Sequence, residues 1–323
     1  MTGATGFLGG ELVKQLIGRG HHVTALVRSL EKASLLKILG VDLRVGDITN
    51  RDSLRGPMQD VDGVFHVAAW YKIGHRGSSS LAERINVQGT RNVLEVARDL
   101  GIRRNVYTST VGVLGDTHGV VVDETYYARG PFLTEYDRTK WLAHYEVAEP
   151  MARAGLPLVI VMPGAIYGPG DTSGIHASLV QLLQRRLYAT PKGVQFCWGY
   201  IADVARGLQQ AMDSGRQGES YLLTGPVHSF EEAFDLAARI ARRRPPFLHP
   251  RPFVMRAAAT AARMLERWDL RAPIASETLR LMAGTTWIGS SAKAATELGF
   301  TARPLEEGLR HTIEHELRQL GMS

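Results

Sequence analysis

The stretch that decides the fold is TGATGFLGG, at residues 2–10. Its glycines Gly3, Gly6 and Gly9 follow a G-x-x-G-x-x-G spacing, a variant of the loop that joins a buried strand to the first turn of a helix. Gly3 permits the tight turn, Gly6 lets the backbone approach a pyrophosphate, and Gly9 allows close packing of the helix. The stretch therefore predicts a dinucleotide-binding loop.

The residues after this loop alternate between short apolar strands and longer helices. Predicted strands read HHVTALVR, VDLRVGD, DGVFHVAA, RNVYTST and LPLVIVMPG, and helical periodicity fills the intervals between them. Such alternation predicts parallel strands, because each crossover has to span a face of the sheet. The predicted fold class is α/β: a doubly wound parallel sheet (Rossmann fold) with a smaller C-terminal substrate lobe.

The predicted domain division follows the point where this alternation loosens. Residues 1–164 are predicted to form the dinucleotide-binding Rossmann domain, to which residues 199–225 return. Residues 165–198 and 226–323 contain proline-rich turns and further helices, and they are predicted to form mainly the substrate-binding lobe.

No strand precedes the glycine loop, although the first strand is central in this fold. Its loss would leave unpaired backbone groups on two neighbouring strands at a buried position. We therefore expect a chain that starts at Met1 to fold poorly, and the native protein to begin several residues earlier.

The composition excludes several classes of protein. The formal net charge of +6 is spread along the chain, and its densest run, Arg242 to Arg244, ends a predicted helix, where cations complement the helix dipole. We therefore expect no nucleic-acid partner. No apolar run has the length of a membrane span and no leader sequence is evident, so we expect no membrane partner.

The cysteine and histidine residues carry no chemistry in this interpretation. The single cysteine, Cys197, excludes an intramolecular disulfide, fits a cytoplasmic location and is expected to be a small buried hydrophobe. His311 and His315 share a predicted helix face, but no third ligand is indicated, so no metal site is predicted.

Two polar residues at strand ends concern the choice of nucleotide. Arg28 ends the second strand expected in this fold, where a carboxylate would bind a ribose 2′-hydroxyl and a guanidinium accommodates a 2′-phosphate. This favours NADP over NAD, with an ordinary surface arginine as the alternative. Asp47 could accept a hydrogen bond from the adenine amino group, although a local role near a helix cap at Asn50 competes.

Tyr136 and Lys140 lie in TEYDRTKWLAH, residues 134–144. Four residues apart on a helix, they share one face, so the ammonium is expected to lower the pKa of the phenol from its usual value of about 10. Such a tyrosine can act as general acid or base at a carbonyl or carbinol. Ser109 or Thr110, at the end of a predicted strand, could present a hydroxyl to the same carbonyl oxygen.

Together these motifs resemble the extended short-chain dehydrogenase/reductases, also called the NAD-dependent epimerase/dehydratase family. The resemblance covers nearly the whole chain and includes the hopanoid-associated sugar epimerases, the dihydroflavonol-reductase-like enzymes and the sterol dehydrogenase group. The motifs that carry it are TGATGFLGG, GDIT, FHVAA, NVQGTRNVLEVA, VYTSTVGVLG, YDRTK, PGAIYGPGD, YIADVARG and SSAKAATELGF.

The resemblance implies roles for particular residues. Tyr136 would be the catalytic acid/base, Lys140 would hold the nicotinamide ribose, and Thr110 takes the place of the usual serine, with Ser109 as the alternative. The implied cofactor contacts are Gly3, Gly6, Phe7, Leu8 and Gly9 at the pyrophosphate, Asp47 and Ile48 at adenine, Ala68 at the ribose and Pro163 at the nicotinamide amide. The sequence departs from the pattern at Tyr200 and Ala202, which replace a common histidine and aspartate, while Asp203 is expected to cap a helix.

The predicted function is that of an NAD(P)-dependent oxidoreductase, in which hydride moves between nicotinamide and a carbonyl or carbinol carbon while Tyr136 exchanges the proton. A nucleotide-sugar epimerase or dehydratase that retains its cofactor is one alternative. A non-catalytic NADP-binding redox sensor is another. The predicted partner is a small-molecule substrate, namely a ketone, aldehyde, alcohol or sugar nucleotide, and a homodimer is possible in such a family.

Overall fold

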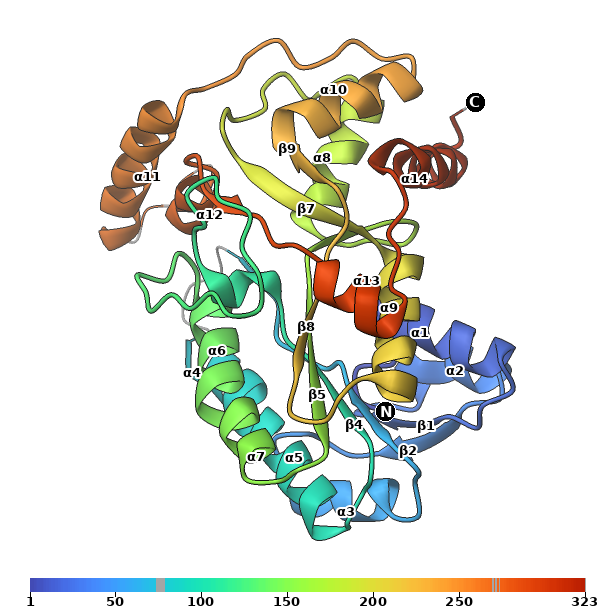
Figure 1. Cartoon of the computed structure of the whole chain (residues 1–323). Helices are drawn as coiled ribbons and strands as arrows, with labels where there is room; N and C mark the ends of the chain where they lie inside the picture. Colours follow the sequence, from blue (N-terminus) through green and yellow to red (C-terminus); the bar gives the residue numbers. More distant parts are fainter. Residues whose placement is uncertain (74–78, 269, 271, 273, 323) are drawn as a thin grey trace.

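The computed structural model describes residues 1–323 apart from residues 74–78, 269, 271, 273 and 323. Its main sheet is parallel and occupies the lower half of the molecule in Figure 1. The strands run in the order β2, β1, then β3, β4, β5 and β8. Their bounds are β1 (Thr24–Val27), β2 (Asp42–Val45), β3 (Val64–His66), β4 (Asn105–Thr108), β5 (Leu158–Pro163) and β8 (Ser220–Leu223).

The first two residues lie between the two halves of this sheet. Thr2 forms parallel bridges with Leu26 on one side and His66 on the other, and the Met1 carbonyl accepts from the Leu26 amide at 2.9 Å. The Met1 amino group donates to the Thr24 carbonyl at 2.7 Å, and burial lowers its pKa to about 6. Two residues thus join strands β1 and β3, and the expected preceding strand stays a prediction.

Helices cover both faces of the sheet, as a doubly wound fold requires (Figure 1). One face carries α1 (Phe7–Gly18) and α9 (Ile201–Ser214), which pack against each other. The other carries α3 (Asp52–Met58), η2 (Arg84–Gln88) with α5 (Gly89–Asp99), and α6 (Glu135–Ala143) with η4 (His144–Ala148) and α7 (Glu149–Arg153). Shorter elements are η1 (Glu31–Ala33), α2 (Ser34–Ile38), α4 (Ser79–Glu83) and η3 (Val111–Leu114). The predicted α/β class is confirmed.

A second, smaller sheet lies above the first in Figure 1. Strands β6 (Ala165–Tyr167), β7 (Gln195–Tyr200) and β10 (Thr286–Trp287) are parallel, and β9 (Val227–Ser229) is antiparallel to β7. The helices of this part are α8 (Gly174–Leu183), α10 (Phe230–Ile240), α11 (Pro252–Arg267), α12 (Ser276–Leu281) and α14 (Leu305–Gln319), while α13 (Ala292–Leu298) lies beside the main sheet. The residue boundaries expected between two domains stay a prediction.

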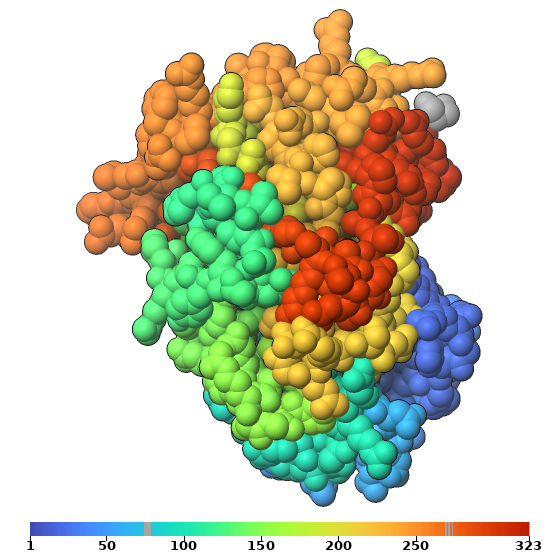
Figure 2. Space-filling model, in the orientation of Figure 1, coloured from blue at the N-terminus to red at the C-terminus, as the bar shows by residue number. Residues whose placement is uncertain are grey.

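The C-terminal helices connect this upper part to the main sheet. In the space-filling view of Figure 2 the red segment lies against both the upper lobe and the yellow α9. Helix α13 contacts α9 and β8, whereas α14 contacts α10. Nearby, Cys197 is fully buried with its Sγ 3.2 Å from the Trp287 carbonyl, and burial raises the pKa of its thiol to about 11. Cys197 is therefore the small buried residue that was expected.

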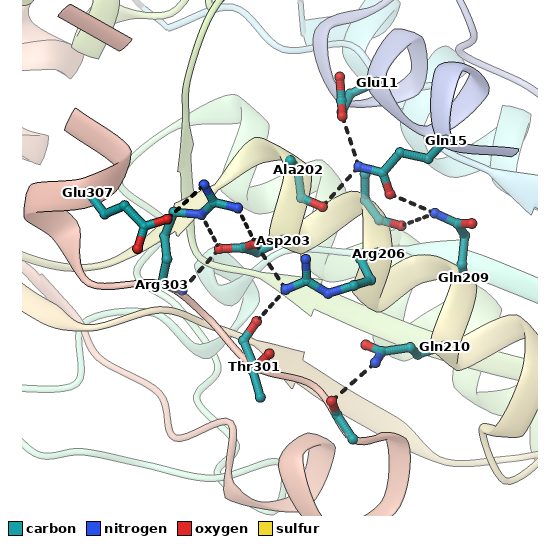
Figure 3. Close-up of polar contacts among 12 residues, drawn as sticks. Glu11, Gln15, Ala202, Asp203, Arg206, Gln209, Gln210, Thr301, Arg303 and Glu307 are labelled. Atoms are coloured by element: carbon teal, nitrogen blue, oxygen red, sulfur yellow. Dashed lines mark hydrogen bonds and ion pairs between the residues drawn. The ribbon is translucent and has the colours of Figure 1, made fainter. Parts of the chain in front are cut away.

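Polar side chains tie α1, α9 and the C-terminal segment together (Figure 3). Gln209 donates to Gln15 at 2.7 Å, while the buried Asp203 accepts from Arg206 and Arg303, each at 2.9 Å. The expectation that Asp203 caps a helix is wrong, because Tyr200 occupies the cap position and Asp203 points to the arginines. The Arg303 guanidinium also lies 4.1 Å from the centre of the Tyr200 ring.

No helix among the residues described combines the length and the apolar character needed to cross a lipid bilayer.

Candidate active site

The residues predicted from strand ends gather at one edge of the main sheet. Because parallel strands all end at the same edge, the loops that follow them lie side by side. The loops or strand ends concerned hold Gly3, after Thr2; Arg28, after β1; Asp47 and Ile48, after β2; Ala68, after β3; Thr110, after β4; and Pro163, at the end of β5.

The glycine loop forms a cradle that side chains would fill. Gly3 has a φ of +75°, and a Cβ there would lie 2.6 Å from the Ala68 amide nitrogen. A Cβ on Gly9 would collide with the Gly3 carbonyl oxygen. Gly6 is exposed at the cap position of α1, and no side chain of the residues described caps that helix. The first-turn amides, including those of Phe7 and Leu8, therefore remain available to an anion.

The residues predicted to contact the adenosine part of the cofactor differ in whether their side chains are available to a ligand. Arg28 lies exposed directly after β1. Asp47 is engaged locally, since its Oδ1 accepts from both the amide and the hydroxyl of Thr49 at 2.8 Å. The Ile48 side chain is buried, and a Cβ on Gly89 would lie 2.8 Å from it. Only the backbone of residue 48 is therefore placed for an outward contact.

Tyr136 lies in the first turn of α6, which begins directly after its cap residue Thr134. The Thr134 hydroxyl accepts from the Asp137 amide at 2.9 Å, a local signal for the start of a helix. The Thr110 side chain lies beside the Tyr136 phenol. Burial raises the pKa of Tyr136, so the predicted lowering by Lys140 is wrong for this structure.

Lys140 extends into the protein interior toward β4. Its side chain has only 2% of its surface exposed, and its Nζ donates to the Tyr107 hydroxyl at 2.9 Å and the Thr108 carbonyl at 2.7 Å. Burial lowers the pKa of Lys140 to about 7. The ammonium is thus fixed to the strand that precedes Thr110, with two donated hydrogen bonds that compete with any donation to the phenol.

The choice between Ser109 and Thr110 is decided by their hydrogen-bond partners. The buried Ser109 hydroxyl pairs with His144 Nδ1 at 2.8 Å. Thr110 accepts from the Gly112 amide at 3.1 Å, and its side chain lies beside the Tyr136 phenol. Thr110 is therefore the hydroxyl that lies with the phenol.

Asn86 is a residue that the sequence reasoning did not select. It lies in the π-helical turn η2, where it accepts from the Trp70 amide at 2.6 Å and donates to the Trp70 carbonyl at 3.1 Å and the Thr139 hydroxyl at 2.9 Å. Asn86 thereby connects the loop after β3 to the helix of Tyr136. A buried amide within the helical run INVQGT was the available signal, since such a group must find partners.

Tyr71 and Asp137 were also missed. The half-exposed Tyr71 ring meets Tyr136 edge-on, with centres 4.8 Å apart. Asp137 is buried beside Tyr136; burial raises its pKa to about 7, and the carboxylate of Glu277 on α12 adds to the effect. Glu277 also accepts from the Glu135 amide at 2.8 Å, so α12 contacts the start of α6. The charged residue next to Tyr136 in YDRTK was visible, but its burial was not.

Comparison with known proteins gives a consistent result. Residues 1–223 match the model of the NAD dependent epimerase/dehydratase family. Sterol demethylase protein B of Methylococcus capsulatus is 32% identical over 306 residues, which cover 93% of this chain and 92% of that protein. A putative dihydroflavonol 4-reductase of Synechocystis is 36% identical over 234 residues, which cover 69% of this chain and 66% of that protein.

Solved structures resemble the whole chain. The crystal structure of gox2253 has a TM-score of 0.85 at 29% identity and covers 100% of this chain and 98% of that chain. MoeE5, in complex with UDP-glucose and NAD, has a TM-score of 0.74 at 25% identity and covers 99% of this chain and 98% of that one. The similarity therefore extends over both the main sheet and the upper part of the molecule.

Proposed function

The chain belongs to the NAD-dependent epimerase/dehydratase family of NAD(P)-dependent enzymes, and on this premise we propose that it is an NADP-dependent reductase of an apolar ketone or aldehyde. Tyr136 would donate the proton and Thr110 would hold the substrate oxygen. The observation that carries the proposal is the position of the Thr110 side chain beside the Tyr136 phenol, at the end of β4.

The protonation state of Tyr136 favours the reductive direction. Because burial raises its pKa, the phenol keeps its proton at neutral pH and can donate it to an oxygen that becomes an alkoxide. Thr110 can donate to the same oxygen, and Lys140 supplies positive charge behind β4 when it is protonated. The nicotinamide supplies the hydride when NADPH is bound.

The residues present fit such a cofactor. The cradle of Gly3, Gly6 and Gly9 leaves room for a pyrophosphate at the uncapped start of α1, where Phe7 and Leu8 offer backbone amides. Further contacts are proposed for Asp47 and Ile48 at adenine, Ala68 and Lys140 at the ribose units, and Pro163 at the nicotinamide. Arg28, exposed after β1, is proposed to bind the 2′-phosphate that distinguishes NADP from NAD.

The named relatives support an apolar carbonyl substrate. They include a ketoreductase for a farnesylated quinoline oxide, a 2-alkyl-3-oxoalkanoate reductase and 3β-hydroxysteroid dehydrogenases. These names describe a carbonyl or hydroxyl group on a compound with a farnesyl, alkyl or steroid skeleton. We therefore propose the same substrate class for this chain.

Replacement of the phenol tests the proposal directly. With NADPH and a panel of alkyl and polycyclic ketones, we expect Tyr136→Phe to lower kcat about 10²–10⁴-fold while NADPH binding persists, since only the transferable proton is lost. Tyr188→Phe is the matched control, because Tyr188 is exposed in the upper part of the molecule. Full activity in Tyr136→Phe would contradict the assignment and would favour the redox sensor.

The choice of nucleotide has its own test. We expect Arg28→Ala to raise KM for NADPH about 10-fold or more and to leave KM for NADH nearly unchanged, because a charge-assisted contact to the 2′-phosphate is lost. Arg98→Ala, on exposed surface of α5, serves as the control. An equal effect on both nucleotides would contradict a specific phosphate contact.

A nucleotide-sugar epimerase is the second candidate, and the similarity to MoeE5 with UDP-glucose and NAD favours it. The two functions differ in how the nucleotide is held, because an epimerase regenerates its cofactor within each cycle. Denaturation of purified protein followed by mass analysis separates them. Near-stoichiometric release of NAD or NADP would support the epimerase, whereas an empty site that binds added NADPH would support the reductase.

A further inference from the structure

Helix α11 distributes its side chains in an unusual way. Its buried residues are the small Ala259 and Ala262, which pack on Leu279 of α12. Its outward residues are large and apolar: Phe253 and Met264 on the helix and Trp268 at its C-cap have 61%, 60% and 81% of their surfaces exposed. At 100° per residue, these three fall on one stripe of the helix, the outer stripe. Burial in the chain itself therefore does not explain their size.

A row of arginines borders the outer stripe. Arg256, Arg263 and Arg267 recur at helical spacing and are all exposed. Residues 239–268 contain eight arginines and a single carboxylate, that of Glu266. The segment is therefore strongly cationic next to an exposed apolar face.

We propose that the outer stripe of α11 binds the surface of an anionic lipid bilayer. An apolar face bordered by arginines suits a helix that lies in the plane of the interface, with its apolar side chains below the headgroups and its cations among the phosphates. A tryptophan such as Trp268 is favoured at that depth. This mode of binding requires no helix that crosses the bilayer.

The positive charge of the arginine row argues against a second copy of the chain as the partner that covers the outer stripe. A two-fold contact through this face would place equivalent surfaces together, so the arginine rows of both copies would approach each other. Glu266 is not free to compensate, because its carboxylate accepts from the amide of Ser276 at 2.8 Å and from its hydroxyl at 2.5 Å. Anionic headgroups complement the row, whereas a second copy repels it.

The outer stripe is connected to the candidate active site. Helix α11 is the outermost element beside α12 in Figure 1, and the corresponding lobe projects from the surface in Figure 2. Glu266 of α11 holds the first turn of α12, whose Glu277 accepts from the backbone at the start of the Tyr136 helix. If the proposed reductase function holds, a bilayer-dissolved ketone is the substrate that this arrangement serves.

Vesicle binding tests the docking surface in the full chain. Four of the five tryptophans are buried, namely Trp70, Trp141, Trp198 and Trp287, so a fluorescence change on addition of vesicles reports Trp268. We expect a blue shift and at least ~10-fold tighter binding to phosphatidylcholine mixed with phosphatidylglycerol than to phosphatidylcholine alone, weakened by salt. Trp268→Phe should abolish the shift and retain most of the sedimentation with vesicles.

Variants separate the two parts of the surface. Phe253→Glu with Met264→Glu should lower vesicle binding ~10-fold or more, and Arg256→Gln with Arg263→Gln should remove the preference for phosphatidylglycerol. Ile38→Glu on α2, where Ile38 is 80% exposed, is the matched control and should bind as the parent does.

Three outcomes would overturn the docking proposal: no vesicle binding, equal loss in the Ile38→Glu control, or a dimer that the Phe253→Glu and Met264→Glu variant dissociates. Reduction of a short water-soluble ketone should be unchanged in that variant. Absence of vesicle binding would therefore contradict the docking proposal but not the proposed reductase. An inactive parent protein would contradict the proposed reductase but not the docking proposal.

Discussion

The helix of Tyr136 and helix α11 use opposite means to hold their positions. Around α6, a set of buried polar side chains, the polar framework, satisfies its hydrogen bonds within the chain; its members are Asn86, Ser109, Thr139, Lys140 and His144. Helix α11 is held on one side by alanines and presents its large apolar residues outward. The directional hydrogen bonds around α6 fix the positions of individual polar atoms. The exposed side chains of α11 instead form an apolar surface.

This difference has an energetic reason. A buried polar group that loses its partner costs more than the bond itself contributes, so each member of the polar framework constrains its neighbours. Apolar contacts are non-directional, and those of small residues contribute little each. Substitutions should therefore be costly near α6 and nearly neutral on the outer stripe of α11.

The largest expected effect on stability is that of Asn86→Ala. It leaves the Trp70 amide and carbonyl without their partner in the interior, and we expect a loss of about 4 kcal/mol in the free energy of unfolding. Asn50→Ala, which removes one exposed bond to the Asp52 amide, should cost less than about 1 kcal/mol. Urea unfolding measures both, and equal costs would contradict the role of the polar framework.

The Asp137→Asn variant tests the buried polar region through the pH dependence of its stability. Burial raises the pKa of Asp137 to about 7 from an ordinary value of 3.8, so the folded state binds more protons than the unfolded state between these values. Stability should therefore fall as the pH rises from about 4 to about 7, and this contribution should be absent in the variant. At pH 8 we expect the free energy of unfolding of the variant to exceed that of the parent by on the order of 4 kcal/mol.

The measurement for Asp137 is urea unfolding of both proteins at several pH values. Their difference should vanish below pH 4 and become constant above pH 8, by which point the titration of Asp137 is complete. If the difference in the free energy of unfolding did not vary with pH, Asp137 would affect stability through its packing and not through its charge.

Much of the site could be predicted because local pattern determines it. The glycine spacing and the strand-end positions follow from the alternation of strands and helices, and the spacing of Tyr136 and Lys140 follows from helix geometry. Which of Ser109 and Thr110 lies beside Tyr136 could not be predicted, because it depends on His144 of η4, whose Nδ1 pairs with the Ser109 hydroxyl. The direction of the Tyr136 pKa shift depends on burial, which the pattern alone does not give.

The outer stripe of α11 could not be predicted from the sequence either. The segment VMRAAATAARMLERW has helical periodicity, and α11 covers it as far as Arg267, with Trp268 at the C-cap. Which face is buried depends on where α12 packs, and a periodic mixture of alanines and large apolar residues would normally predict the large ones inside. Long-range packing, not propensity, reverses that assignment.

The smallest expected effect is that of Phe253→Ser combined with Met264→Ser. Both side chains lie on the outer stripe, so we expect the free energy of unfolding in buffer to change by less than about 0.5 kcal/mol. Leu12→Ser is the contrast, because Leu12 on α1 is completely buried and should cost about 3 kcal/mol or more. With phosphatidylglycerol vesicles present, only proteins with an intact outer stripe should gain stability, since a ligand of the folded state stabilises it. A double variant that is strongly destabilised in buffer would mean that α11 already covers apolar surface of its own chain, and the contrast with the polar framework would then be lost.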